Sequence, residues 1–237
     1  MKFLVIMPTY NESKSLENTV ADLFENVPDA KLLIVDDNSP DGTGKLADEL
    51  AKTNDRIAVL HRLGKNGLGM AYIDGFRWAR ERNYEFVVEM DADGSHRGED
   101  LPKLLAAAPD NDLVIGSRYV RGGGSVGWPL SRRLISKIGN RYTSIMLGAR
   151  IHDITAGFRI YRLEKLIGLL DGVAAQGYAF QVELAWLMRK AGARITEVPI
   201  TFIERSYGES KMSSAIVREA LWLTTKWGLG RLFRRRP

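Results

Sequence analysis

The stretch Lys31–Thr43 has the sequence KLLIVDDNSPDGT and passes from a strand through a turn into a helix. Its apolar residues are consecutive and do not alternate with polar ones, which is typical of a strand buried on both faces. Asn-Ser-Pro-Asp-Gly favours a tight turn, and Thr43 can cap the helix that follows. The stretch therefore predicts one strand–helix unit of an α/β protein.

The same unit recurs along the first half of the chain. The predicted strands are Phe3–Met7, Lys31–Val35, Ile57–Leu60, Phe86–Met90 and Leu113–Gly116, and the predicted helices are Ser15–Glu25, Thr43–Ala51, Gly69–Arg82 and Glu99–Ala107. Repeated units with this spacing predict a doubly wound, mostly parallel sheet flanked by helices. Ligands bind such sheets at the carboxyl ends of the strands.

The pattern changes after residue 120. Gly122–Gly124 breaks regular structure, and the segments beyond it predict helices at Leu130–Leu147, Ala179–Ala191 and Ser214–Trp227, strands at Gly157–Arg162 and Ile195–Phe202, and a polar loop over Glu204–Ser213. No internal repeat and no low-complexity linker is present, so one domain is the simplest interpretation.

The composition is that of a globular protein, with 237 residues, 45% hydrophobic and 27% charged. A chain of this size can fold unaided. It has no cysteine, which excludes thiol catalysis, disulfides and cysteine-rich zinc sites. The absence of zinc-finger spacing and of an RRM signature argues against a nucleic-acid partner.

The formal charge of +5 comes from the end of the chain. Residues 226–237 contain five basic residues and no acidic one, so the first 225 residues are balanced. A basic end predicts contact with an anionic surface such as a membrane. The apolar stretch Ala215–Leu232 is interrupted by four charged residues, and we therefore expect a cytoplasmic protein that meets the membrane only at its surface.

Two acidic pairs follow predicted strands. Asp36 and Asp37 emerge from a buried strand and can accept hydrogen bonds from a nucleotide. Asp91 and Asp93, in Met90-Asp-Ala-Asp93, can face a Mg2+ or Mn2+ ion that also binds a diphosphate. The similar pair Asp110–Asp112 precedes its strand and would lie at the opposite edge of the sheet. His96 follows the second pair and is a candidate to line the site.

Basic residues lie in or beside loops that can face the same edge: Arg118, Arg132, Arg133, Arg205, Lys65 and Lys211. Arginine binds phosphate through two parallel hydrogen bonds, so the group suits a phosphate-bearing substrate. A solvated basic surface is the alternative for any one of them.

Several motifs together resemble family 2 glycosyltransferases of the GT-A (Rossmann-like) fold, and the later ones resemble the dolichyl- or polyprenyl-phosphate mannosyltransferases of that family. The shared motifs are Met7-Pro-Thr-Tyr-Asn-Glu12, Val35–Thr43, Gly67–Tyr72 and Met90–His96; the more specific ones are Gly116–Tyr119, Gly127-Trp128, Arg132–Ser136, Asp153–Arg159, Gly177–Gln181 and Glu204–Met212. The resemblance covers residues 3 to about 215.

The resemblance implies inverting transfer of mannose from GDP-mannose to a polyprenyl phosphate. It implies a nucleotide-sugar site formed by Pro8, Tyr10, Glu12, Val35, Asp37, Lys65, Asp91, Ala92, Asp93, Arg118, Arg205 and Lys211. The metal ligands would be Asp91 and Asp93, with Ser95 acting through water because some relatives have a longer Gln there. Asp93, Arg118 and Arg205 would be catalytic, and Arg118, Arg132, Ser136 and Arg205 would bind the acceptor phosphate.

Many members of the family continue into transmembrane helices, and we do not expect such helices in this chain. We therefore divide it into a glycosyltransferase domain, 1–212, and an amphipathic, basic, membrane-proximal segment, 213–237. In a helix, Ile216, Val217, Ala220, Leu221, Leu223 and Trp227 would share a broad apolar face. The segment is expected to lie on the anionic cytoplasmic leaflet, and an integral-membrane partner subunit is another possible anchor.

Other functions remain open at this point. The nearest is a polyprenyl-phosphate glucosyltransferase or another family 2 enzyme that uses a UDP-sugar. A non-catalytic membrane adaptor is disfavoured by the intact Asp91, Asp93 and Arg205. A dinucleotide-dependent oxidoreductase is disfavoured because no Gly-x-Gly-x-x-Gly follows the first strand.

Overall fold

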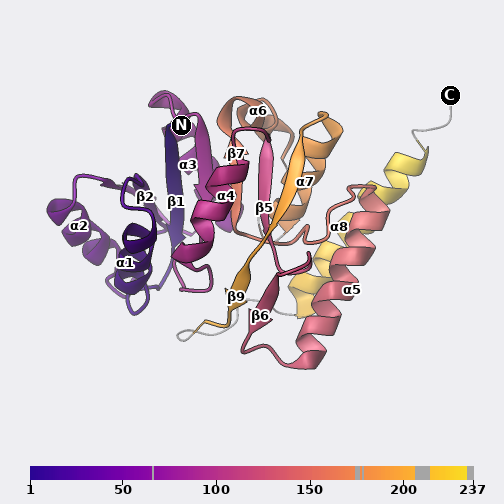
Figure 1. The fold of residues 1–237 in the computed structure, drawn as a ribbon, viewed down its shortest axis with the longest axis horizontal. Coiled ribbons are helices and arrows are strands. Elements are labelled where there is room, and N and C mark those ends of the chain that lie inside the picture. The colour runs from indigo at the N-terminus through magenta and orange to yellow at the C-terminus, as the bar shows by residue number, and fades with distance from the viewer. Residues whose placement is uncertain (66, 174–176, 178, 206–213, 234–237) are drawn as a thin grey trace.

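A seven-stranded sheet runs through the centre of the molecule (Figure 1). The computed structural model describes residues 1–65, 67–173, 177, 179–205 and 214–233, and of residues 214–220 and 231–233 it describes the helix but not the side chains. The strand order is β3-β2-β1-β4-β7-β5-β8. All neighbours are parallel except the two pairs that include β7. The predicted mostly parallel, doubly wound sheet is therefore confirmed.

Six of the seven predicted strands agree with the structure to within one or two residues at their ends. Strands of the main sheet are β1 (Phe3–Thr9), β2 (Leu32–Asp36), β3 (Ile57–His61), β4 (Phe86–Glu89), β5 (Leu113–Ser117), β7 (Arg159–Arg162) and β8 (Ile195–Pro199). The predicted strand Gly157–Arg162 begins two residues later, as β7.

Helices cover both faces of the sheet. One face packs against α1 (Leu16–Asn26), α2 (Thr43–Thr53) and α4 (Leu101–Ala107), which follows the short η1 (Gly98–Asp100). The other packs against α3 (Leu68–Glu81), α6 (Leu163–Ile167), η2 (Leu170–Gly172) and α7 (Ala179–Lys190). Successive residues of a strand enter opposite cores: in β1, Leu4 and Ile6 face one and Val5 and Met7 the other. This two-sided burial explains the consecutive apolar runs in the sequence.

A second, two-stranded sheet lies beyond the end of β5. It pairs β6 (Gly124–Val126) with β9 (Thr201–Ile203) in parallel. The single strand predicted over Ile195–Phe202 is wrong, because the chain leaves the main sheet at Ile200. The N–H of Ile200 bonds to the carbonyl of Ser117 and its own carbonyl accepts from Gly124, at 3.1 and 3.0 Å. Strand β6 was not predicted because its partner is distant in sequence.

Two helices pack side by side at one edge of the molecule, α5 (Leu130–Leu147) and α8 (Ser214–Phe233) (Figure 1). The range of α5 was predicted correctly, whereas α8 extends beyond the predicted Trp227. Trp227 stacks on Trp186 of α7, with ring centroids 5.7 Å apart. Within the described part of the chain, no helix is both long and apolar enough to cross a membrane.

Glu89 is an ionisable side chain inside the core. It is fully buried in β4 opposite Arg159, and burial raises the pKa of Glu89 from 4.5 to about 8 despite the attraction of Arg159. In the unfolded chain this carboxyl ionises near its ordinary pKa of 4.5. The contribution of Glu89 to the free energy of unfolding is therefore fully present below about pH 4.5, and it declines as the pH rises toward about 8.

Glu89→Gln, which cannot ionise, is expected to remove this decline. The melting temperature of the variant, relative to the parent, should rise by at least about 5 °C between about pH 5 and about pH 8, since one pKa unit corresponds to about 1.4 kcal/mol and 1 kcal/mol to about 2–4 °C in a chain of this size. Thermal melts in metal-free buffer measure it. A difference that is constant with pH would contradict the pKa of Glu89.

Candidate functional site

Two adjacent aspartates at the carboxyl end of β2, Asp36 and Asp37, have different partners. Asp36 is buried, and its carboxylate accepts hydrogen bonds from the hydroxyls of Thr9 at 3.0 Å and Ser39 at 2.6 Å. It therefore stabilises the turn. Thr43 does not cap the helix as predicted. Gly42, in a left-handed conformation, occupies the cap position, and the Thr43 hydroxyl accepts the N–H of Glu12 at 3.0 Å.

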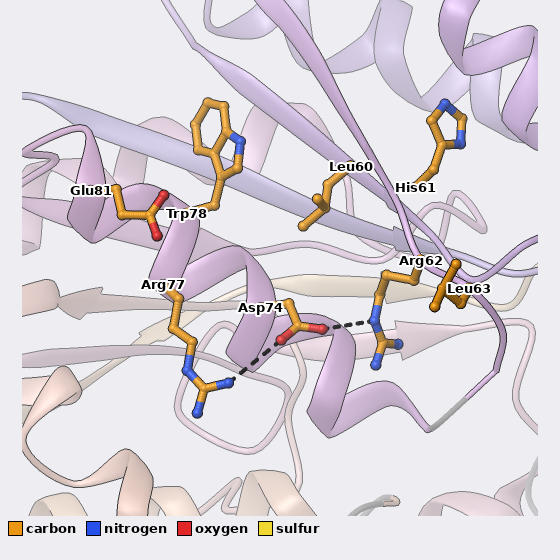
Figure 2. Close-up of a pocket in the computed structure, with 8 residues that line it drawn as sticks. All are labelled: Leu60, His61, Arg62, Leu63, Asp74, Arg77, Trp78 and Glu81. Atoms are coloured by element: carbon orange, nitrogen blue, oxygen red, sulfur yellow. Dashed lines mark hydrogen bonds and ion pairs between the residues drawn. The ribbon is translucent and has the colours of Figure 1, made fainter.

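Arg62, which the sequence analysis did not single out, pairs with Asp37. Its guanidinium also contacts Asp74 of α3 at 2.9 Å (Figure 2). Burial raises the pKa of Asp37, and Arg62 opposes that rise. A depression of about 450 Å3, lined in part by Arg62 and Asp74, lies between β3 and α3. Figure 2 draws the side chains that line it. Arg62 thus links the predicted nucleotide side to the outer edge of the sheet.

Tyr10 and Lys65 lie together near the end of β1. The ammonium of Lys65 is 4.0 Å from the centre of the Tyr10 ring. A flat ring beside a cation, close to Asp37, is suited to a nucleotide base and its phosphates. Pro8 and Glu12 flank Tyr10 in sequence and are half-buried. The side chain of Val35 is fully buried in the core, so Val35 would meet a ligand through its main chain.

The carboxyl end of β4 presents Asp91, held by His96. The Asp91 N–H donates to Nδ1 of His96 at 3.0 Å, and Nε2 of His96 lies 4.0 Å from Asp91 Oδ2. The His96 ring is buried and stacks on Phe158. Burial raises the pKa of Asp91, and the neighbouring Asp93 adds to the rise. Asp91 and Asp93 repel each other, and His96 and Arg205 oppose this effect only in part. A cation bound between the two carboxylates would relieve the remaining repulsion.

Asp93 and Arg205 are brought together from distant parts of the chain. Arg205 Nη1 lies 3.4 Å from Asp93 Oδ2, and the other oxygen of Asp93 accepts the Ser95 N–H at 3.0 Å. Ala92, between the two aspartates, is buried, and its carbonyl accepts the hydroxyl of Thr19 at 3.1 Å. The predicted acidic pair and one predicted phosphate-binding arginine therefore form one cluster.

The donor set of this cluster fits a divalent cation. Among the described residues, no three His, Cys, Asp or Glu side chains are grouped tightly enough to hold a metal by themselves. Mg2+ commonly takes one or two protein carboxylates and completes its shell with water and substrate phosphates, and this is what Asp91 and Asp93 offer. The hydroxyl of Ser95 is buried and has no hydrogen-bond partner in the described chain. That orphan atom is consistent with its predicted role as a water-mediated ligand.

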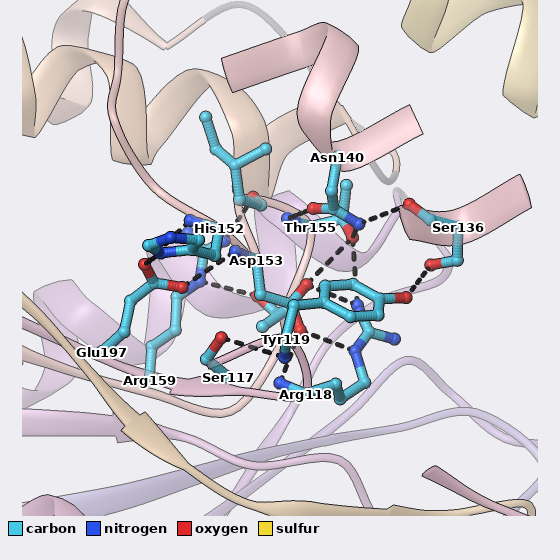
Figure 3. A network of polar contacts seen from close by, with 12 residues as sticks. Ser117, Arg118, Tyr119, Ser136, Asn140, His152, Asp153, Thr155, Arg159 and Glu197 are labelled. Atoms are coloured by element: carbon cyan, nitrogen blue, oxygen red, sulfur yellow. Dashed lines mark hydrogen bonds and ion pairs between the residues drawn. The ribbon is translucent and has the colours of Figure 1, made fainter. Parts of the chain in front are cut away.

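Arg118 is more constrained than predicted. It donates to both oxygens of the fully buried Asp153, at 2.7 and 2.6 Å, and to Thr155 at 3.1 Å (Figure 3). Although burial opposes it, the Asp153 charge raises the pKa of Arg118. Asp153 is held in turn by Glu197, which accepts its N–H at 2.8 Å. Nε and Nη2 of the guanidinium are thus bonded to protein, and within the described residues Nη1 makes no such hydrogen bond and can face a ligand.

Helix α5 forms a wall next to Arg118. Ser136 accepts the hydroxyl of Tyr119 at 2.6 Å, and Asn140, one turn along, donates to Thr155 at 3.0 Å (Figure 3). Arg132, one turn before Ser136, donates to Glu204 at 2.6 Å and lies over the Trp128 ring. The predicted acceptor residues Arg118, Arg132 and Ser136 therefore line one wall, which we call the α5 wall.

Phe202 lies between the cluster that contains Asp91 and Asp93 and the α5 wall. The centre of its ring lies 5.8 Å from the centre of the His96 ring and 5.3 Å from that of the Trp128 ring. The guanidinium carbon of Arg118 lies 5.5 Å from the same point. Phe202, Tyr119 and Asp153 were not predicted as site residues from the sequence. The predicted Lys211 lies outside the described residues, and Arg133 is exposed on α5.

The glycine at position 127 allows the close approach of two segments here. Gly127 has φ +85°, and a β-carbon on it would lie 2.8 Å from Cβ of Glu204. Only glycine combines this conformation with this space. The Gly127-Trp128 motif therefore has a structural reason: it places Trp128 against Arg132.

Comparison with known proteins gives a consistent result. Residues 4–170 match the model of glycosyl transferase family 2. An undecaprenyl-phosphate mannosyltransferase of Micrococcus luteus is 54% identical over 97% of this chain and 95% of its own. A polyprenol monophosphomannose synthase of Mycolicibacterium smegmatis is 51% identical over 98% of this chain and 89% of its own.

Solved structures share the fold at low sequence identity. A mannosyltransferase from Pyrobaculum calidifontis in complex with GDP-Man and Mn2+ has a TM-score of 0.64 and 20% identity, over all of this chain and 65% of that one. A glucosyl-3-phosphoglycerate synthase from Mycobacterium tuberculosis in complex with Mn2+ and UDP-glucose has a TM-score of 0.67 and 19% identity, over 97% and 80%. At this identity the likeness shows the GT-A architecture and nothing about the substrate.

Proposed function

The chain belongs to glycosyl transferase family 2, and from that premise we propose that it transfers mannose from GDP-mannose to the phosphate of a polyprenyl phosphate, with inversion. The observation that supports this most strongly is the identity of 54% and 51% to two relatives whose names specify mannose and a polyprenyl carrier. The products would be polyprenyl-phosphate mannose and GDP.

The donor side would bind the nucleotide and its diphosphate. Pro8, Tyr10, Glu12 and Asp37 with Lys65 would hold the nucleoside, and Val35 would do so through its main chain. Asp91 and Asp93, with Ser95 acting through water, would hold Mg2+ or Mn2+, which when bound neutralises the diphosphate of the departing GDP. Arg205, 3.4 Å from Asp93, is placed to add a second positive charge there. Ala92 would approach the diphosphate with its main chain, and Lys211 would contact it as well.

The acceptor side needs no general base. A phosphate monoester is already anionic at neutral pH, so one of its oxygens can attack the anomeric carbon directly. The bond from that carbon to the diphosphate oxygen breaks, and GDP leaves with the electron pair. In-line positioning and charge neutralisation are then the main requirements. Arg132 and Ser136 on the α5 wall would seat the phosphate, and Arg118 would assist through Nη1.

A polyprenyl phosphate is a membrane lipid, so the enzyme would work at a membrane surface. We place it on the cytoplasmic face as a peripheral protein, with residues 1–212 as the catalytic domain and 213–237 as the membrane-proximal segment. An integral-membrane partner subunit would be a further anchor. The absence of a spanning helix in the described chain is consistent with either arrangement.

A sugar-transfer assay tests the proposal. Purified protein is given polyprenyl phosphate and Mg2+ or Mn2+, with GDP-mannose, GDP-glucose or UDP-glucose in separate reactions. We expect butanol-extractable mannosyl lipid from GDP-mannose, at least about tenfold more than from either glucose donor, since a site that hydrogen-bonds one ligand discriminates strongly against others. Transfer only from UDP-glucose would overturn the sugar assignment. If no donor supports transfer even when membranes are added, the proposal that this chain by itself transfers mannose is contradicted.

A further inference from the structure

The carboxylate of Asp91 has a side-chain nitrogen or hydroxyl group of the protein facing each of its two oxygens. The hydroxyl of Tyr72 lies 3.4 Å from Oδ1, and Nε2 of His96 lies 4.0 Å from Oδ2. The two groups come from different elements, because Tyr72 belongs to α3 and His96 to the loop that follows β4. Asp91 itself is half-buried, so its carboxylate is still open to a ligand on its remaining side.

The position of the proton on the His96 ring follows from its other nitrogen. Nδ1 accepts the main-chain N–H of Asp91 at 3.0 Å, and a ring nitrogen that accepts a hydrogen bond carries no proton. In a neutral imidazole the proton is then on Nε2. Nε2 therefore presents an N–H, and not a lone pair, to the Asp91 carboxylate.

Packing fixes the orientation of the His96 ring. The residue is 3% exposed, and its ring stacks on Phe158 with centres 4.9 Å apart and meets Phe202 edge-on at 5.8 Å. A β-carbon on Gly157 would lie 3.5 Å from Cε1 of His96 and 3.6 Å from Oδ2 of Asp91. The Cε1–Nε2 edge of the ring and the carboxylate therefore border the same narrow space.

Packing also fixes the hydroxyl of Tyr72. The residue is fully buried, and its ring stacks with Phe76 and Phe180, with centres 6.0 and 6.3 Å away. A phenol keeps its proton at neutral pH, whereas an ionised carboxylate only accepts hydrogen bonds. The hydroxyl is therefore a donor directed at Asp91.

From this arrangement, and resting on the proposed function in which Asp91 and Asp93 hold the metal, we infer that Tyr72 and His96 are positioning residues. Each holds one oxygen of the Asp91 carboxylate, so that the remaining lone pairs are turned toward the cation. Removing a group that orients a metal ligand typically costs about 10–100-fold in metal affinity or activity. Both contacts are long, as is common for hydrogen bonds of an active site before its ligands bind.

Two substitutions at His96 separate this role from a purely structural one. His96→Gln keeps an amide N–H near the position of Nε2 but loses the acceptor for the Asp91 N–H. His96→Asn keeps that acceptor and has no group that reaches the carboxylate. Calorimetry measures the affinity of the full-length protein for Mn2+ in the presence of GDP. We expect the dissociation constant to rise at least about tenfold in His96→Asn and to stay within about threefold of the parent value in His96→Gln. A structural role alone predicts the reverse order, which would overturn the inference.

Tyr72→Phe removes the second donor and keeps the buried ring. The dissociation constant for Mn2+ is expected to rise about tenfold. Tyr161→Phe is the matched control, because Tyr161 is also fully buried but its hydroxyl accepts from Arg159 at 3.1 Å. Loss of that hydrogen bond should lower the melting temperature and leave the affinity for Mn2+ within about twofold of the parent value.

Nitrogen-15 NMR of the metal-free protein reads the protonation of His96 directly. The chain has three histidines, so the His96 signals are assigned by their loss in His96→Gln. The spectrum should show a proton on Nε2 and none on Nδ1. A proton on Nδ1 would overturn the inference, because Nδ1 could not then accept the N–H of Asp91.

Sugar transfer separates this inference from the proposed function. In His96→Asn, raising the Mn2+ concentration by the factor lost in affinity should restore the transfer rate, which it would not do for a misfolded variant. Weakened Mn2+ binding in the variants of a parent that transfers no sugar would support the positioning role and refute the transfer. Equal Mn2+ affinity in the parent, His96→Asn and Tyr72→Phe would overturn the inference, as would a parent that binds no Mn2+ in the presence of GDP.

Discussion

Asp93→Asn is expected to lower sugar transfer by about a thousandfold or more while the protein stays folded. Removal of a single group that stabilises developing charge commonly costs a factor of about 10²–10³. Asp93 does more than one such group, because its carboxylate both offers a cation ligand and pairs with Arg205 at 3.4 Å. Asparagine has nearly the same shape and still accepts the N–H of Ser95, so packing should survive.

The measurement is initial transfer rate at saturating metal, together with metal affinity by calorimetry. Asp110→Asn is the matched control: it changes the same residue type in the other Asp-x-Asp pair, whose first member is exposed and precedes β5. Its rate should equal that of the parent within about twofold, as is usual for surface substitutions. A variant at Asp93 that kept more than a tenth of the parent rate would exclude this carboxylate from the catalytic centre.

Asp153→Ala is expected to lower the free energy of unfolding by about 3–5 kcal/mol, the usual cost of removing one partner from a buried ion pair. Asp153 is fully buried and accepts bonds from the main chain and guanidinium of Arg118. Alanine would leave a buried guanidinium without its counter-charge. At about 2–4 °C for each kcal/mol, the melting temperature should fall by about 10 °C.

Urea unfolding measures this effect directly. Glu49→Gln serves as the comparison, since Glu49 pairs with Lys52 on the surface and both side chains are about two-thirds exposed. Exposed pairs of this kind contribute about 0–1 kcal/mol. Asp153→Glu should recover part of the loss by keeping the charge. Equal midpoints for Asp153→Ala and Glu49→Gln would show that Arg118 does not depend on Asp153.

The prediction at Asp153 also changes the role expected for Arg118. From the sequence, Arg118 is predicted to bind phosphate because arginine suits that ligand. In the structure Arg118 is 9% exposed at its side chain and forms a fork with Asp153. Arg205 and Arg132 have single-point pairs at 19% and 34% exposure, and they retain more capacity for a substrate phosphate.

The sequence by itself determined the strands of the sheet, most helix ranges, and the positions of Asp91 and Asp93. These follow from local rules. A strand buried on both faces requires consecutive apolar residues, a helix requires its 3.6-residue period, and parallel strands bring their carboxyl ends to one edge. The acidic pair after β4 was therefore separable from the pair before β5 without any coordinates.

Only the tertiary structure decided which charged groups pair. Asp36 and Asp37 are adjacent, yet one stabilises a turn and the other binds Arg62. Arg118 finds Asp153, and strand β6 finds β9, across long stretches of chain. The same holds for α5, whose apolar stripe resembles a core-facing helix in sequence but is exposed here. A periodic pattern shows that a helix has an apolar face, and the packing of distant elements determines whether that face is covered.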